Sequence, residues 1–114
     1  MASADELRTV ALSLPQAVEK PHFDRTSFRV DAARGKIFAT LPGDADTANL
    51  KLTPEQQDML CQAEPDLFAP VPNKWGESGW TVIQLRTIDL VTLKSALIMA
   101  WKTAAPEKLW DQLT

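Results

Sequence analysis

The chain has 114 residues, of which 45% are hydrophobic and 24% charged, a size and composition typical of one folded domain and not of a disordered chain. Its formal net charge of −3 excludes a protein whose whole surface binds nucleic-acid phosphates. The single cysteine, Cys61, excludes an internal disulfide and favours a reducing compartment.

The first predicted element is a helix that begins at a capping box of Ser3 and Glu6, in which each side chain accepts a hydrogen bond from a backbone N–H near the other residue. Apolar residues recur at helical spacing over 7–14, which predicts one buried stripe. Pro15 is expected to end the helix because its ring clashes with the preceding turn.

Three strands are predicted next, over 26–31, 36–41 and 47–52, because apolar and polar residues alternate within each segment. The intervening segments 32–35 and 42–46 hold the glycines and the proline of this region, and they predict turns. Sequential strands joined by tight turns indicate an antiparallel meander.

The alternation also predicts which side chains lie together. The apolar side of 36–41 is expected to hold Ile37, Ala39 and Leu41, and the polar side Lys36, Phe38 and Thr40. The polar side of 47–52 is expected to hold Thr47, Asn49 and Lys51.

A second helix is expected to begin at Thr53, with Gln56 completing another capping box, and to end at Pro65. Its apolar side is expected to consist of Met59, Leu60 and Ala63.

Residues 66–79 are expected to form a loop rich in Pro and Gly, followed by a strand over 81–86. The last long helix is expected to begin at Asp89, to bury Trp101 on its apolar stripe and to break at Pro106. This order predicts an α+β fold: one antiparallel sheet of about four to five strands with helices packed on one face, including helices near both chain ends. A single domain over 1–114 is expected.

The sequence does not predict a catalytic or metal site. The only histidine, His22, and the only cysteine, Cys61, lack the paired spacing of metal ligands. Cys61 lies within a predicted helix, where a thiol usually packs as a small hydrophobe. Because phosphate-loop and nucleophile-elbow motifs are absent as well, we expect no catalytic residue, no metal, no cofactor and a protein that is not an enzyme.

The polar side of the predicted sheet is the main candidate site. Arg29, Lys36, Asn49 and Lys51 are expected to project from neighbouring strands, with Phe38 among them. Cations beside an aromatic ring can bind phosphate and stack a nucleobase. The alternative is a solvated face on which the Lys and Arg stems cover that ring.

Six segments carry a resemblance over almost the whole chain: Glu19–Phe23, Ser27–Val30, Lys36–Thr40, Asn49–Leu52, the Trp-Gly-x-x-Gly-Trp pattern of Trp75–Trp80, and Ala100–Trp101. In order and spacing they are similar to the MmcQ/YjbR family. The resemblance implies an α+β fold like the CyaY-type sandwich, with a double wing proposed for DNA binding, and it implies no catalytic residue or cofactor. The acidic net charge and the short turn at 32–35 depart from the basic loops that such a wing needs.

Two functional hypotheses follow. In the first, the protein binds DNA, because 20–51 carries six bases against four acids. The phosphate contacts would come from Arg25, Arg29, Arg34, Lys36, Lys51 and Lys74. In the second, it is an adaptor for a small anionic ligand or a protein, with binding residues Lys20, His22, Lys36, Asn49, Lys51, Trp75 and Trp80. A concave pocket would favour the second hypothesis and a contiguous basic strip the first.

No membrane partner is expected, because the chain has no apolar run of about 18 residues. Acidic residues near the N-terminus do not suit a secretion signal. Both observations predict a cytoplasmic protein.

Overall fold

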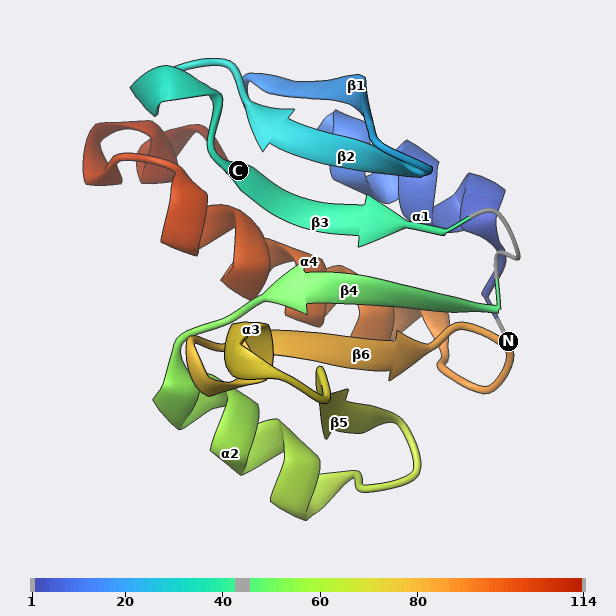
Figure 1. Ribbon diagram of the computed structural model, residues 1–114. Coiled ribbons are helices and arrows are strands. Elements are labelled where there is room, and N and C mark those ends of the chain that lie inside the picture. The colour runs from blue at the N-terminus through green and yellow to red at the C-terminus, as the bar shows by residue number, and fades with distance from the viewer. Residues whose placement is uncertain (1, 43–45, 114) are drawn as a thin grey trace.

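The alternating segments of the chain form one six-stranded sheet in which every pairing is antiparallel (Figure 1). The structure is a computed structural model that describes residues 2–42 and 46–113. The strand order is β1-β2-β3-β4-β6-β5. The strands are β1 (Ala17–His22), β2 (Arg25–Val30), β3 (Ile37–Leu41), β4 (Thr47–Lys51), β5 (Phe68–Pro70) and β6 (Trp80–Gln84). The predicted α+β class is confirmed, with six strands rather than four to five.

The two strands without a sequence prediction are those at the edges of the sheet. β1 does not alternate apolar with polar residues and contains Pro21, which an edge strand tolerates because no neighbour needs its missing N–H. β5 has only three residues and lies within the segment expected to be a loop. Neither strand buries enough residues on one side to show the two-residue alternation of apolar and polar side chains that predicts a strand.

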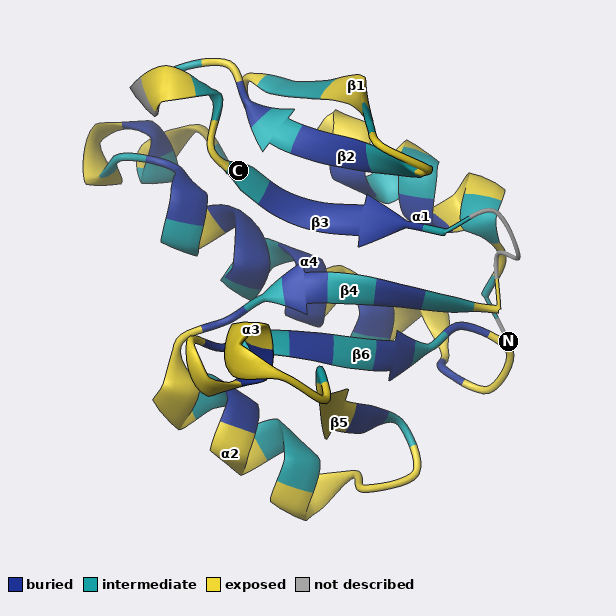
Figure 2. Cartoon of the chain, viewed as in Figure 1, coloured by how far each residue is buried: buried dark blue, intermediate teal, exposed yellow. Residues whose placement is uncertain are grey.

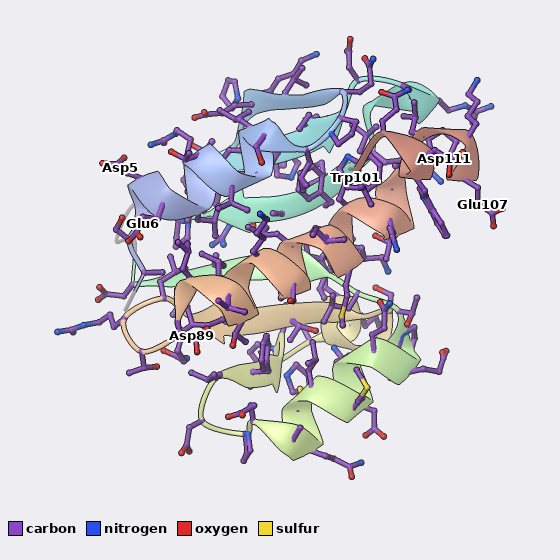
Figure 3. The ribbon with its side chains drawn as sticks, turned by 180° about the vertical axis from the view of Figure 1, so that it is seen from behind. Asp5, Glu6, Asp89, Trp101, Glu107 and Asp111 are labelled. Carbon is purple, nitrogen blue, oxygen red and sulfur yellow. The ribbon has the colours of Figure 1, made fainter. Side chains whose placement is uncertain are left out.

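Three long helices cover one face of the sheet: α1 (Ala4–Ser13), α2 (Pro54–Ala63) and α4 (Leu90–Ala104). Figure 3 shows α1 and α4 in front of the strands when the molecule is seen from behind, with α2 along the β5 edge of the sheet. The capping boxes at Ser3 and Thr53 are both formed, and Asp89 caps α4 through the N–H of Thr92. None of the helices in the described ranges is long and apolar enough to cross a bilayer.

Short helical segments complete the chain: the 3-10 turn Ala33–Gly35, α3 (Lys74–Glu77) and the 3-10 segment Glu107–Leu113. α3 lies on the sheet face opposite the three long helices (Figure 1). That face is otherwise without a helix in the described part of the chain.

The core lies between the sheet and helices α1 and α4 (Figure 2). Trp101 is fully buried there, and its indole N–H donates to the carbonyl oxygen of Pro15 at 2.9 Å. The prediction that Trp101 belongs to the core is therefore confirmed. Other fully buried side chains include Phe28, Leu50, Ile83, Leu93 and Leu97.

A β-bulge overturns the predicted sides of β3. Phe28 pairs with Ala39, but the next residue of β2, Arg29, pairs with Ile37, so Phe38 is an extra residue without a partner of its own. The strand therefore turns Phe38 into the core, where it is fully buried. The prediction that Phe38 lies among the cations was wrong, and Ile37 takes the opposite side instead.

Helix α2 buries a polar residue where an apolar stripe was expected. Met59 is exposed, whereas Gln57 is buried. The Gln57 amide donates to the carbonyl oxygens of Gly76 at 2.9 Å and Trp80 at 3.0 Å. These bonds satisfy the buried amide and attach the segment from Gly76 to Trp80 to the helix.

Candidate functional site

The sheet face opposite α1 and α4, here called the open face, carries cationic side chains. Lys20, Ser27, Thr40 and Asn49 pair in sequence across β1, β2, β3 and β4, so they occupy one row on this face. Arg25 lies two residues from Ser27 and therefore shares its side. The described strand positions on this face include no Asp or Glu. Glu19 points to the other side, where it pairs with Arg8 of α1.

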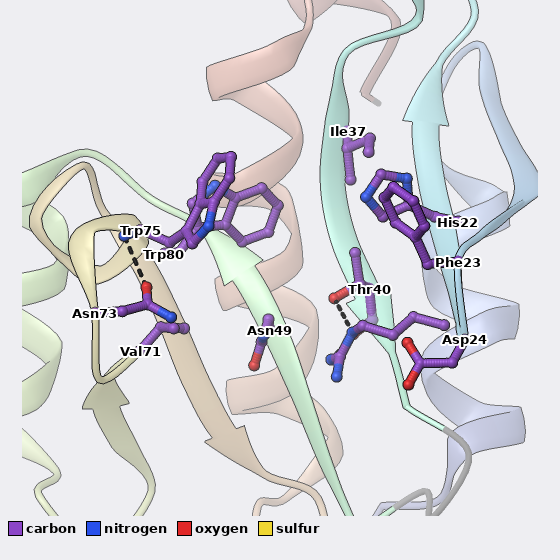
Figure 4. A pocket seen from close by; sticks show the side chains of 11 residues that line it. His22, Phe23, Asp24, Ile37, Thr40, Asn49, Val71, Asn73, Trp75 and Trp80 are labelled. Carbon is purple, nitrogen blue, oxygen red and sulfur yellow. Dashed lines mark hydrogen bonds between the residues drawn. The ribbon is translucent and has the colours of Figure 1, made fainter.

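A central cleft of about 450 Å³ opens on this face. Its lining consists of His22, Phe23, Asp24, Arg25, Ile37, Thr40, Asn49, Val71, Asn73, Trp75 and Trp80. Figure 4 shows the two tryptophans on one side of the cleft and His22 with Phe23 on the other, with Asn49 between the two groups. The cleft therefore has two walls that contain aromatic rings, and its volume is within the range of small-ligand sites.

Phe23 forms one wall at an energetic cost to the fold. It lies in the turn between β1 and β2 with φ at +60°, a conformation that disfavours side chains with a Cβ. Its side chain is 95% exposed, and it contacts the His22 ring edge-on with centroids 4.9 Å apart. Neither the backbone conformation nor the exposure of Phe23 stabilises the fold. Phe23 is therefore the strongest candidate for a residue whose role is to bind a ligand.

Replacing Phe23 by glycine should leave the free energy of unfolding unchanged or raise it by up to about 1 kcal/mol, because strain is relieved while the unfolded chain gains freedom. Urea denaturation measures the change. The matched control is Gln16→Gly, at an exposed residue outside the cleft that also has φ at +60°. A clear loss of stability in Phe23→Gly alone would contradict this account, because Phe23 would then contribute to folding.

The second wall is the segment 73–79, which contains α3 and is held by its own hydrogen bonds. The Asn73 side chain accepts from the N–H of Trp75 at 2.8 Å, and the Ser78 hydroxyl donates to the Trp75 carbonyl oxygen at 2.9 Å. Gly79 has φ at +111° and donates to the carbonyl oxygen of Gly76. This segment presents Trp75 with 65% of its surface exposed.

Hydrogen bonds also orient the two arginines beside the cleft. The Arg25 Nε donates to the Thr40 hydroxyl at 2.9 Å. The Arg29 Nε donates to the Ser27 hydroxyl at 3.0 Å, and its Nη2 lies 3.5 Å from Nδ1 of His22. A guanidinium has five N–H donors, so Arg29 keeps donors for a ligand.

The predicted site residues separate into three groups. His22, Asn49, Trp75, Trp80 and Arg25 line the central cleft. Lys36 and Lys51 line a second hollow beside it. Lys20, Arg29, Arg34 and Lys74 line neither, although Arg29 contacts His22.

Three cations of the open face and its second hollow, Arg29, Lys36 and Lys51, form no ion pair with an acid in the described part of the chain. Carboxylates do form ion pairs at Arg8. Asp24 is the acid that lines the cleft. The open face can therefore attract an anionic ligand.

Sequence reasoning missed Phe23, Ile37 and Asn73 as lining residues. Phe23 stood within a quoted segment, and an aromatic residue at the tip of a hairpin was an available signal. Ile37 could not be found, because its side depends on the bulge at Phe38. Asn73 precedes the Trp-Gly pair as a helix cap, a position that its residue type favours.

Residues 2–42 and 46–113 contain no group of three or more His, Cys, Asp or Glu side chains placed to hold a metal ion. Cys61 is half-buried and packs against the hydrophobic core, as expected of a thiol that acts as a small hydrophobe. Burial raises the pKa of its thiol, and the charge of Asp58 raises it further, so the reactive thiolate is disfavoured at Cys61.

The family model YjbR matches residues 12–103. Among solved structures, the crystal structure of the Deinococcus radiodurans protein DR2400, which has a DUF419 domain, is similar with a TM-score of 0.75 and 26% sequence identity. The similarity covers 99% of this chain and 88% of that one. No curated protein matches the chain significantly.

Proposed function

This chain belongs to the YjbR family, and from its open face we propose that it is a binding module for single-stranded nucleic acid, DNA in particular. The observation that carries the proposal is the cleft with aromatic residues on both walls, set into a face whose charged strand residues are cations. Base stacking on aromatic side chains and phosphate binding by cations are the two interactions that single-strand binding proteins combine.

The aromatic walls favour a single strand over a duplex. Phe23 projects from the turn between β1 and β2 and Trp75 from the short helix α3, and both expose most of their surface. Each ring can therefore stack on a base that is not stacked on neighbouring bases. A duplex keeps its bases stacked and offers phosphates to a convex basic ridge. The cleft is concave and the net charge of the chain is −3, which suits a local site better than a wide duplex interface.

We further propose that the protein acts in the cytoplasm and binds without catalysing a reaction. The single cysteine supports a reducing compartment. The cleft lining combines the Arg25 guanidinium and two amides with aromatic and apolar side chains, and it includes one imidazole and one carboxylate, a set that suits recognition of an anionic ligand.

The test is a titration of fluorescently labelled oligothymidylate, followed by anisotropy at low salt. We expect binding at micromolar protein, weaker binding to a duplex of the same length, and an affinity that falls as salt increases. Lys94→Met is the control, because Lys94 is exposed on α4, on the other face of the sheet.

Three outcomes would contradict the proposal. Absence of binding at low salt would remove nucleic acid as the ligand. Tighter binding to the duplex would remove base stacking as the mechanism. Equal binding of free thymidine monophosphate and the oligonucleotide would instead identify a small anionic ligand with an aromatic ring.

A further inference from the structure

A second hollow lies beside the central cleft and has a different chemical character. It has a volume of about 370 Å³ and is lined by Lys36, Ile37, Lys51, Trp80, Thr103 and Ala104. It shares Ile37 and Trp80 with the cleft, so the two are neighbours across these side chains. Its lining includes two cations and no acid, whereas the cleft includes Asp24 beside Arg25.

The hollow exists because β3 and β4 separate toward one end. The two strands pair at Ala39 with Leu50 and at Thr40 with Asn49, and the ladder ends before Phe38 and Lys51. Figure 1 shows the start of β3 and the end of β4 diverging over α4. Thr103 and Ala104 of α4 therefore reach the lining, and the Thr103 hydroxyl lies 3.1 Å from the Lys51 carbonyl oxygen.

Lys51 is held in place at the edge of this hollow. Its ammonium donates to the carbonyl oxygen of Ser78, and an ammonium has three N–H donors, so two remain for a ligand. Burial lowers the pKa of Lys51. A partly desolvated ammonium attracts an anion more strongly than an exposed one, because less water screens the charges.

We propose that this lysine hollow, formed by Lys36, Lys51, Trp80 and Thr103, is a phosphate-binding subsite for the nucleotide whose base occupies the central cleft. The inference rests on the proposed function and assigns the base and the phosphate of the nucleotide to two neighbouring sites. The base of the nucleotide is assigned to the central cleft because Phe23 and Trp75 line that cleft. The phosphate is assigned to the lysine hollow because both charged residues of the hollow are cations. Trp80 belongs to both linings, which places base and phosphate next to each other.

The first test uses labelled oligothymidylate with Lys36→Met and Lys51→Met, which keep the apolar stems and remove the charges. Each variant should bind about fivefold to tenfold more weakly at low salt, and its logarithmic salt dependence should be shallower by about one. Lys94→Met should match the unmodified protein. The subsite is refuted if both variants retain the affinity and the salt dependence of this control while the unmodified protein binds the oligonucleotide.

The second test does not depend on nucleic acid. Inorganic phosphate is titrated while the side-chain nitrogen resonances of Lys36 and Lys51 are followed by NMR. We expect both resonances to shift, the pKa of Lys51 to rise as phosphate binds, and Lys36→Met to weaken the effect on Lys51. Unchanged resonances at millimolar phosphate would overturn the subsite, whereas a phosphate response without oligonucleotide binding would uphold it and refute only the proposed function.

Discussion

Replacing Gly79 by alanine should lower the free energy of unfolding by about 3 kcal/mol or more, because the added atom has no space and the backbone disfavours it. A Cβ at this position would lie 1.9 Å from the carbonyl oxygen of Leu52, and φ is +111°. The chain cannot move aside easily, because the Leu52 N–H donates to the Gly79 carbonyl oxygen at 3.1 Å. Urea denaturation followed by tryptophan fluorescence measures the loss.

Gly35→Ala is the matched control for this prediction. Gly35 also has a positive φ, of +65°, but nothing lies within 4 Å of the position its Cβ would take. Its replacement should therefore cost only the backbone strain, about 1 kcal/mol. Equal losses in the two variants would show that the close approach to Leu52 is not what requires glycine at position 79.

Replacing Trp75 by alanine should weaken oligothymidylate binding by about tenfold to a hundredfold, the effect of losing one stacked base. The free energy of unfolding should change by no more than about 0.5 kcal/mol, because a side chain with 65% exposure contributes little to the core. Binding is measured by anisotropy and stability by urea denaturation on the same preparation. Phe23→Gly should likewise weaken binding without loss of stability, whereas Gln16→Gly should leave binding unchanged.

Val91→Ala is the control for Trp75→Ala. Val91 is 77% exposed and lies on α4, which packs on the opposite face of the sheet. Its replacement removes exposed apolar surface without touching the cleft and should leave affinity unchanged. If Trp75→Ala binds as tightly as Val91→Ala, the cleft does not stack a base against this wall.

Helix starts and most strands could be predicted because their signals are local. Ser3 with Glu6 and Thr53 with Gln56 form capping boxes over three residues, and the same residues would do so in any fold that exposed the helix end. The alternation in 47–52 likewise identified β4, whose Asn49 and Lys51 do lie on the side opposite the core. The family pattern was also detectable before the fold was known.

The cleft was predicted only in part, because its walls join segments far apart in the chain. The carbonyl oxygens of Gly76 and Trp80 accept hydrogen bonds from the Gln57 amide. A polar residue is therefore buried on α2, where the local pattern favoured Met59. The cleft faces Ile37 because β3 bulges at Phe38, and the bulge depends on how β3 pairs with β2. Neither effect leaves a signal within one turn of helix or one pair of strand residues.

The amino-acid order alone was therefore sufficient for the fold class, the helix caps, the buried Trp101 and the cationic character of the segment from Lys20 to Lys51. Only the packed chain showed that Phe23 and Trp75 face one cleft and that two lysines line a hollow beside it. Capping and alternation depend on residues within a few positions of each other. The cleft depends on strand register and helix docking, which are determined by contacts across the whole chain.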